Sequence, residues 1–291
     1  RTVDDPRPPS FAALQSVRDG ETGGRGAYLR GCRLIAEQKF GPAGREFENA
    51  VKADTGNAVY HFWFGRATGE QAQRANVLRQ PGLARRTKAE FEKAAALDPT
   101  YIPAREGLVR YYLSAPGFLG GGIDHARAQA AEITKIHPYR GGLAYANVAF
   151  AAKDTAALVR VHQGLLAQYP DSATPNFALL NVHLARRQWA PAWVVLDQLE
   201  RAHPELAVIP YAIGRAAAES GEQMDRGEAA LRAYLQHSPR PNEPSRAATQ
   251  WRLGMLLERR GDRAGARTAY EAAIALDPQL RQAKDALAKL K

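Results

Sequence analysis

The sequence predicts an all-α protein, an α-solenoid in which helical hairpins stack one after another. Three observations support this fold class. Helix-favouring residues (Ala, Leu, Arg, Glu and Gln) are abundant along the 291-residue chain. Runs rich in β-branched residues are almost absent outside residues 159–161 and 194–195, which argues against strands. Prolines recur at a nearly regular spacing, which indicates an internal repeat.

The recurring prolines mark where successive hairpins end. Proline cannot continue a helix, and it moves the preceding residue out of the α region. The intervals between them are 39, 32, 34, 35 and 39 residues. The prolines concerned are Pro99, Pro138, Pro170, Pro204, Pro239 and Pro278. Each therefore predicts the end of one helical hairpin.

This spacing predicts the elements in chain order. Residues 1–23 form a proline-rich extension with a short helix near residues 10–17. Seven hairpins follow, over residues 24–56, 57–100, 101–139, 140–171, 172–205, 206–240 and 245–279. Residues 280–291 form a capping helix that is apolar on one face and otherwise charged, because the end of a solenoid faces water.

The last hairpin carries the most specific pattern in the chain. It comprises Trp251, Leu253, Gly254, Leu257, Gly261, Ala266, Tyr270, Ala273 and Pro278. This order resembles the tetratricopeptide repeat, a helix-turn-helix unit of about 34 residues. The resemblance extends over nearly the whole chain and is weakest in the fourth and sixth hairpins. It implies a right-handed solenoid that acts as a non-catalytic adaptor or scaffold for protein partners.

Two hairpins are longer than this unit. About ten residues are added around residues 71–83 of the second hairpin, and five at residues 114–122 of the third. Equivalent turns of adjacent repeats lie along one edge of a solenoid, so we expect the two insertions to touch. Phe118 and Leu119 would then be buried against the first insertion or against a partner. Residues 115–122 resemble a feature of exported bacterial tetratricopeptide proteins, and the first insertion resembles regulators of microtubule dynamics.

The concave groove is the predicted binding site. The fifth and ninth positions of each first helix face it, and they hold mainly aromatic residues and arginines, which are typical of interface hot spots. The predicted groove residues are Tyr28, Phe62, Arg66, Arg110, Tyr145, Phe177, Tyr211, Arg215 and Trp251. The predicted loop residues are Arg74, Arg79, Phe118 and Leu119. The alternative is that the aromatic column mainly packs against neighbouring hairpins.

The sequence predicts no catalytic residue, metal site or cofactor. Its seven histidines lack the His-Glu-x-x-His frame, and Cys32 alone cannot build a thiolate site. The glycines at 120–122 precede Asp124, which suits a helix cap better than a phosphate cradle. A small-molecule or enzymatic accessory role at the insertions remains the alternative. Nucleic-acid binding ranks third. The net charge is +10, but the basic residues are distributed over most repeats with acidic residues between them.

Partner and compartment follow from the same observations. The arginines favour an acidic protein or peptide, whereas the oligomeric state stays open. No apolar stretch approaches the roughly 18 residues that a membrane span requires. The chain begins at Arg1 without methionine, so a removed signal peptide fits a periplasmic or secreted protein, with the cytoplasm as the alternative.

Overall fold

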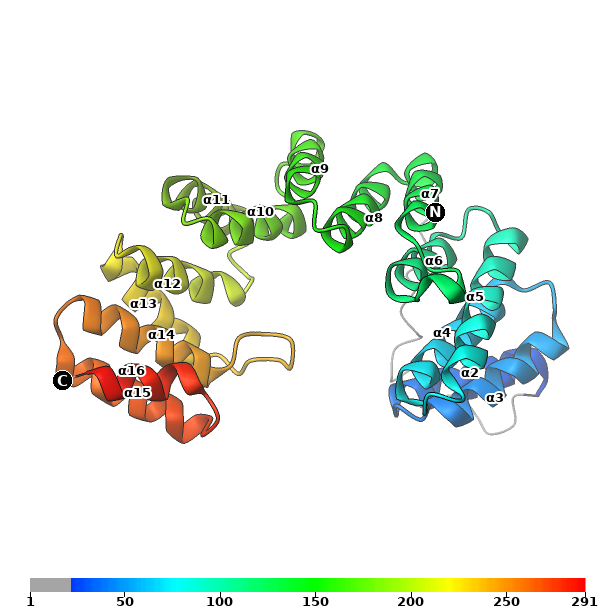
Figure 1. Cartoon of the computed structure of the whole chain (residues 1–291), viewed down its shortest axis with the longest axis horizontal. Helices are drawn as coiled ribbons and strands as arrows, with labels where there is room; N and C mark the ends of the chain where they lie inside the picture. Colours follow the sequence, from blue (N-terminus) through cyan, green and yellow to red (C-terminus); the bar gives the residue numbers. More distant parts are fainter. Residues whose placement is uncertain (1–21, 291) are drawn as a thin grey trace. The chain divides into compact units, whose positions relative to one another are not determined.

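The computed structural model describes residues 22–290 and is entirely helical over that range (Figure 1). These residues form fifteen α-helices and one 3-10 helix, with no strand. The all-α prediction is therefore confirmed. The short helix expected near residues 10–17 lies outside the described residues. Contacts divide the chain into two compact units, of which the N-terminal unit ends at Val161 and the C-terminal unit begins at His162.

The N-terminal unit consists of helical hairpins that pack on one another. Its helices are α2 (Gly23–Ala36), α3 (Phe40–Ala53), α4 (Ala58–Arg74), α5 (Gln80–Leu97), α6 (Ile102–Ser114), η1 (Gly117–Leu119), α7 (Ile123–Ile136) and α8 (Pro138–Ala151). Consecutive helices from α2 to α8 contact each other. The boundary between the units falls within α9 (Thr155–Gln168).

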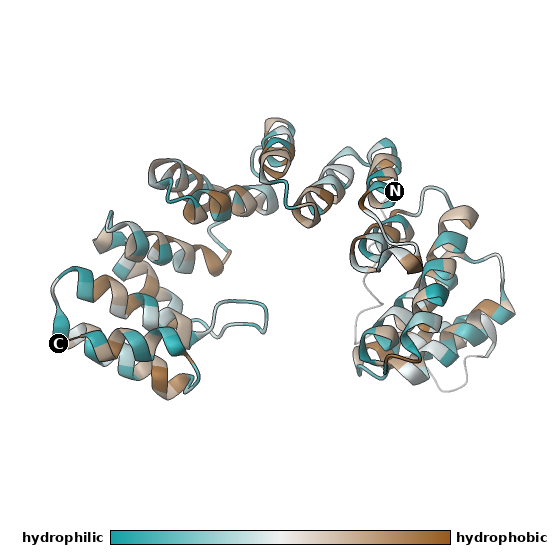
Figure 2. Ribbon diagram, in the orientation of Figure 1, coloured by the Kyte–Doolittle hydropathy of each residue, from teal (hydrophilic) through white to brown (hydrophobic). Residues whose placement is uncertain are grey.

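The C-terminal unit repeats this arrangement. Its helices are α10 (Ala173–Ala185), α11 (Trp189–Ala202), α12 (Val208–Ser220), α13 (Met224–Leu235), α14 (Arg246–Arg259), α15 (Arg263–Leu276) and α16 (Arg281–Lys289). The predicted capping helix corresponds to α16, which packs against α14 and α15. Figure 2 shows apolar and hydrophilic residues alternating along the helices, as amphipathic helices require.

Polar caps and proline define where several helices begin. The Ser245 hydroxyl accepts a hydrogen bond from the Ala248 amide at 3.1 Å, and the Asn57 side chain accepts from the first amides of α4. Such caps satisfy amides that lack a partner within the helix. Pro138, which the spacing marks as the end of the third hairpin, is the first residue of α8. Proline fits there because the first amide of a helix needs no partner.

Small residues allow the two helices of a hairpin to approach closely. A Cβ placed on Gly65 of α4 would lie 2.9 Å from the ring of Phe91 in α5. Gly254 of α14 lies against the ring of Tyr270 in α15 in the same way. Phe91 is 7% exposed and Tyr270 is fully buried, so glycine makes room for a large core side chain in both hairpins.

The first insertion is not a loop. It lengthens α4 to 17 residues and α5 to 18, so that only residues 75–79 lie outside a helix. The reason is composition, since the inserted stretch is rich in Gln, Ala, Leu and Arg, which favour helix. The second insertion forms η1, which packs against α5. Phe118 nevertheless stays 76% exposed, so packing within the chain does not bury it as expected.

Candidate functional site

Arg66 and Arg110 form the centre of the candidate site, in the N-terminal unit. Arg66 projects from α4, where its guanidinium carbon lies 4.7 Å from the centroid of the Trp63 ring. Burial lowers the pKa of the Arg66 guanidinium, and the nearby charge of Arg110 lowers it further. Arg110 projects from α6 and is exposed. The two arginines are thus close enough to repel each other.

The acidic side chains nearest to these arginines are engaged elsewhere. Glu106 holds Arg140 through both carboxylate oxygens, at 2.9 and 2.8 Å. Glu70 attracts Arg66 electrostatically, but its carboxylate pairs with Arg74 at 2.6 Å. Within residues 22–290, neither Arg66 nor Arg110 has a carboxylate in ion-pair distance. An incoming carboxylate would therefore meet two cations that no described residue holds in an ion pair.

Tyr28 and Cys32 lie on α2, where Tyr28 is partly exposed and Cys32 is fully buried close enough to Arg66 to feel its charge. Tyr28 stacks on Tyr60, with 5.5 Å between ring centroids, and forms a side-chain hydrogen bond with Cys32. Burial raises the pKa of the Cys32 thiol to about 12, although Tyr28 and Arg66 act in the opposite direction. The thiol is therefore neutral near pH 7 and is not a nucleophile there. This agrees with a binding surface rather than a reactive site.

Phe62 lies beneath this surface. It is 6% exposed and packs against Trp63, Phe91 and Tyr101 at centroid distances of 5.6–5.8 Å. Tyr145 of α8 is partly buried against the same hydrophobic core. Phe62 therefore supports the aromatic surface from the core and presents little area to a ligand, whereas Tyr28 and Tyr145 keep part of their rings accessible.

The predicted groove residues of the C-terminal unit have a different electrostatic setting. Phe177, Tyr211 and Trp251 are partly buried against the hydrophobic core of that unit. Arg215 pairs with Glu219 at 3.1 Å, and Arg252 reaches the same carboxylate at 2.7 Å. Arg215 thus has a carboxylate within ion-pair distance, which it shares with Arg252, whereas Arg66 has none among the described residues. This difference favours the N-terminal unit as the place where an acidic group binds.

The predicted loop residues lie around the two long turns. Arg74 stacks on the Phe40 ring at 4.3 Å while paired with Glu70. Arg79 is exposed at the start of α5. In the second turn Leu119 is partly buried, and its carbonyl accepts a hydrogen bond from the Tyr111 hydroxyl at 2.9 Å. The turn is therefore fixed to α6 even though Phe118 points into solvent.

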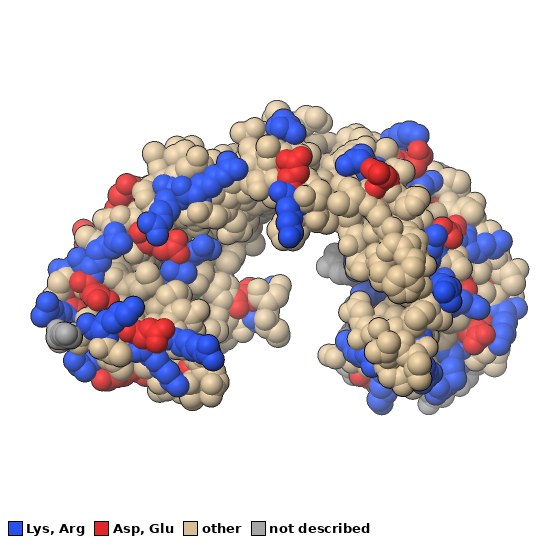
Figure 3. Space-filling view, viewed as in Figure 1, with Lys and Arg blue, Asp and Glu red and all other residues tan. Residues whose placement is uncertain are grey.

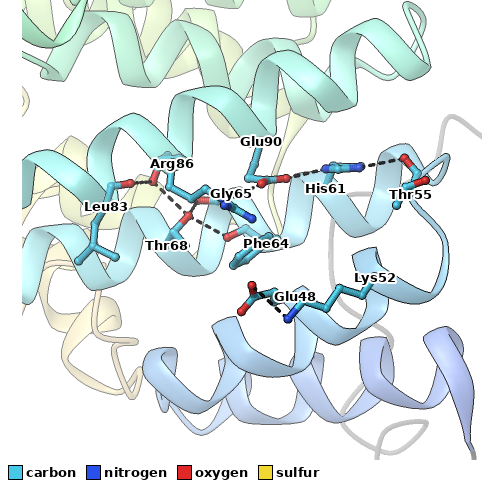
Figure 4. Close-up of polar contacts among 11 residues, drawn as sticks. Glu48, Lys52, Thr55, His61, Phe64, Gly65, Thr68, Leu83, Arg86 and Glu90 are labelled. Atoms are coloured by element: carbon cyan, nitrogen blue, oxygen red, sulfur yellow. Dashed lines mark hydrogen bonds and ion pairs between the residues drawn. The ribbon is translucent and has the colours of Figure 1, made fainter.

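A buried polar network between α4 and α5 was not predicted (Figure 4). His61 lies between the Glu90 carboxylate, 2.5 Å from Nδ1, and the Thr55 carbonyl, 3.1 Å from Nε2. Arg86 pairs with the other oxygen of Glu90 at 2.6 Å. Both His61 and Glu90 are buried, so the network holds the two long helices together. Neither residue stands in a sequence motif, and only their places on neighbouring helices bring them together.

Charge elsewhere is mixed. On the visible faces of both units, basic groups outnumber acidic ones and the two kinds are interspersed among uncharged side chains (Figure 3). No group of three His, Cys, Asp or Glu residues suited to a metal ion occurs within residues 22–290. Across the same residues, no helix is both long enough and apolar enough to span a membrane.

Comparison with known proteins identifies one repeat directly. Residues 247–280 match the tetratricopeptide repeat family model. No curated protein matches the chain in sequence. Three solved structures are similar in fold: a tetratricopeptide repeat protein from Parabacteroides merdae (TM-score 0.54, 13% identity), yeast Tom70 (0.60, 13%) and Pseudomonas aeruginosa pilF (0.53, 12%).

Coverage differs among these structures. The match covers 92% of this chain and 98% of the Parabacteroides protein, and 95% of this chain and 99% of pilF. It covers 99% of this chain but only 60% of Tom70. At these identities the likeness shows the fold, which is that of an α-solenoid of helical hairpins.

Proposed function

Since the chain contains a tetratricopeptide repeat and folds as proteins built from such repeats do, we propose that it is a non-catalytic scaffold that binds a segment of a protein partner. The groove of the N-terminal unit is the proposed site. The bound segment carries an acidic side chain or a terminal carboxylate. Arg66 and Arg110 bind that group.

One observation carries the proposal: two neighbouring arginines without a carboxylate partner among the described residues. Arg66 is half-buried and repelled by Arg110, which lowers its pKa. A carboxylate placed between the two guanidinium groups would offset their repulsion and raise the pKa of Arg66, because it supplies an opposite charge and accepts charge-assisted hydrogen bonds. Such bonds contribute about 1.5–3 kcal/mol each. The site therefore favours an anion over any neutral group.

Two aromatic residues of the same unit would supply the rest of the surface. Tyr28 and Tyr145 are partly exposed and held rigid by the core beneath them. Large, rigid rings contribute contact area with little loss of side-chain entropy. We propose that they contact apolar side chains that flank the acidic group. The bound segment would then combine acidic and apolar residues.

The test is a pull-down from native extract with the wild-type chain and the Arg66→Glu/Arg110→Glu variant. We expect the variant to lose partners that the wild type retains. Arg127→Glu/Lys135→Glu is the matched control, since it reverses the same number of charges at exposed side chains of the same unit that are already paired with Asp124 and Glu132. Loss of the same partners in this control would point to net charge as the cause and would contradict the proposed site.

A further inference from the structure

Three large apolar side chains are exposed on the two long turns of the N-terminal unit. Val77 is 80% exposed, Leu78 92% and Phe118 76%. Val77 and Leu78 lie in the link between α4 and α5, and Phe118 lies in η1 between α6 and α7. Leaving such side chains in water is unfavourable, so their grouping on two turns indicates a contact surface.

The two turns are joined through α5. Val77 and Leu78 directly precede the first turn of α5, and η1 packs on that helix. Lys88 of α5 comes within 3.0 Å of the position that a Cβ on Gly120 would occupy, and its ammonium lies 5.7 Å from the Tyr112 ring centroid. Gln80, the first residue of α5, and Lys88 are roughly 12 Å apart along the helix axis, at about 1.5 Å per residue. The apolar tips therefore belong to one edge of the unit.

This edge carries more basic than acidic residues. Residues 71–89 contain five arginines and lysines and neither Asp nor Glu, and the second turn, residues 114–122, contains no charged residue. Arg74, Arg86 and Lys88 pair with glutamates just outside these stretches. Arg79 and Arg85 are exposed and form no ion pair within the described residues. Stretches without Asp or Glu elsewhere hold fewer basic residues, with three arginines in residues 22–36 and two in residues 172–196.

We propose that this edge docks on an anionic lipid surface, with Val77, Leu78 and Phe118 entering the interface and Arg79 and Arg85 contacting phosphate or carboxylate headgroups. Apolar side chains ringed by cations fit the boundary between headgroups and acyl chains. Cations near such a surface strengthen binding, each by a few-fold. Phe118 is the only aromatic residue among the three apolar tips, and aliphatic Val77 and Leu78 offer no ring on which successive nucleic-acid bases could stack, so a lipid surface fits better than a single strand.

This surface is separate from the groove that binds the acidic segment in the proposed function. Arg66 and Arg110 serve the groove, whereas the lipid surface rests on Arg79, Arg85 and the apolar tips. A scaffold of this kind would hold its partner at a membrane without a spanning helix. The two proposals use different residues and can fail independently.

The test is co-sedimentation of the full chain with vesicles of phosphatidylcholine alone and of equal parts phosphatidylcholine and phosphatidylserine. We expect binding to the anionic vesicles, weakening as salt rises, and little binding to the neutral ones. The variant Val77→Ser/Leu78→Ser/Phe118→Ser is expected to lower the partition coefficient by roughly tenfold or more, because it removes most of the inserted apolar area. Arg79→Gln/Arg85→Gln is expected to lower it several-fold.

Matched controls separate this surface from others. Phe150→Ser removes an aromatic ring that is 74% exposed on α8, and Arg66→Gln/Arg110→Gln removes the groove cations; both should leave vesicle binding unchanged.

A fluorophore on Leu78→Cys, in a Cys32→Ser background, should shift its emission to the blue on anionic vesicles. Equal binding to neutral vesicles, no binding to anionic vesicles at low salt, or unchanged binding of the triple variant would overturn the proposal. So would tight binding of a single-stranded oligonucleotide that competes with the vesicles.

Discussion

His61 and Glu90 face each other across the α4–α5 hairpin, with 2.5 Å between Nδ1 and Oε2 and only 8% of either side chain exposed. These two helices are the ones that the first insertion lengthens, and they carry Arg66 at one side and the Val77–Leu78 turn at their tip. The buried pair therefore fixes the helix on which both proposed surfaces depend.

Removing one partner of this pair should destabilise the N-terminal unit. Glu90→Ala leaves His61 and Arg86 without their carboxylate, and breaking a buried pair in this way typically costs about 3–5 kcal/mol. Urea denaturation measures the change in the free energy of unfolding. Asp124→Asn, at an ion pair with Arg127 where the aspartate is 92% exposed, is the control and should cost at most about 1 kcal/mol. Similar losses in the two variants would contradict the assigned role of the buried pair.

Replacing glycine by alanine should change the stability of the fold in opposite directions at two positions. A Cβ on Gly254 would overlap the Tyr270 ring, so Gly254→Ala should cost roughly 1–3 kcal/mol of stability through overpacking. Gly164 lies in α9 with no atom within 4 Å of an added Cβ, so Gly164→Ala should stabilise by about 0.5–1 kcal/mol through helix propensity. Thermal denaturation of both variants checks the pair. A stabilised Gly254→Ala variant would show that α14 and α15 are not this close.

Stability should fall at alkaline pH, partly because of Cys32. Burial raises the pKa of its thiol from 9.0 to about 12. A group whose pKa is raised on folding contributes stability that is complete below its unfolded pKa and is lost as pH rises through the folded pKa. The loss attributable to Cys32 therefore falls between about pH 9 and about pH 12. Denaturation across this range should show a shallower decline for Cys32→Ala than for the wild type. Parallel curves would mean that the thiol is more accessible than its burial implies.

Much of the fold follows from local sequence. Helices α5 and α9 end two residues before Pro99 and Pro170. Gly254 lies against the ring of Tyr270 in the neighbouring helix of its hairpin, as the repeat pattern of a small residue facing a large one predicts. These are short-range or one-repeat relationships, so spacing alone reveals them. The helical state of residues 71–74 and 80–83 follows from composition, although a 34-residue unit has no place for these additional helical turns. The division at Val161 falls in the fourth hairpin, where α9 buries only His162 and Leu165.

Less of the candidate site could be predicted. Position in the repeat suggests which side chains face the groove, but it does not show which arginines are already paired. Glu106 pairs with Arg140 from the next hairpin, and Arg215 pairs within its own helix. These partners depend on rotamers and helix packing, so Arg66 and Arg215 look equivalent in sequence although their surroundings differ. The exposure of Phe118 likewise depends on how η1 rests on α5.

The most direct test of the account is the affinity of the N-terminal groove for an acidic segment. Isothermal titration would compare a short peptide of Glu and Leu residues with its Gln-substituted counterpart. We expect measurable binding of the acidic peptide alone, and a loss of about 100-fold or more in Arg66→Gln/Arg110→Gln, since two charge-assisted hydrogen bonds at about 1.5–3 kcal/mol each amount to about 3–6 kcal/mol. The control Arg215→Gln should bind as the wild type does. Equal affinity for the two peptides, or unchanged affinity in the double variant, would contradict the claim that Arg66 and Arg110 recognise an acidic partner.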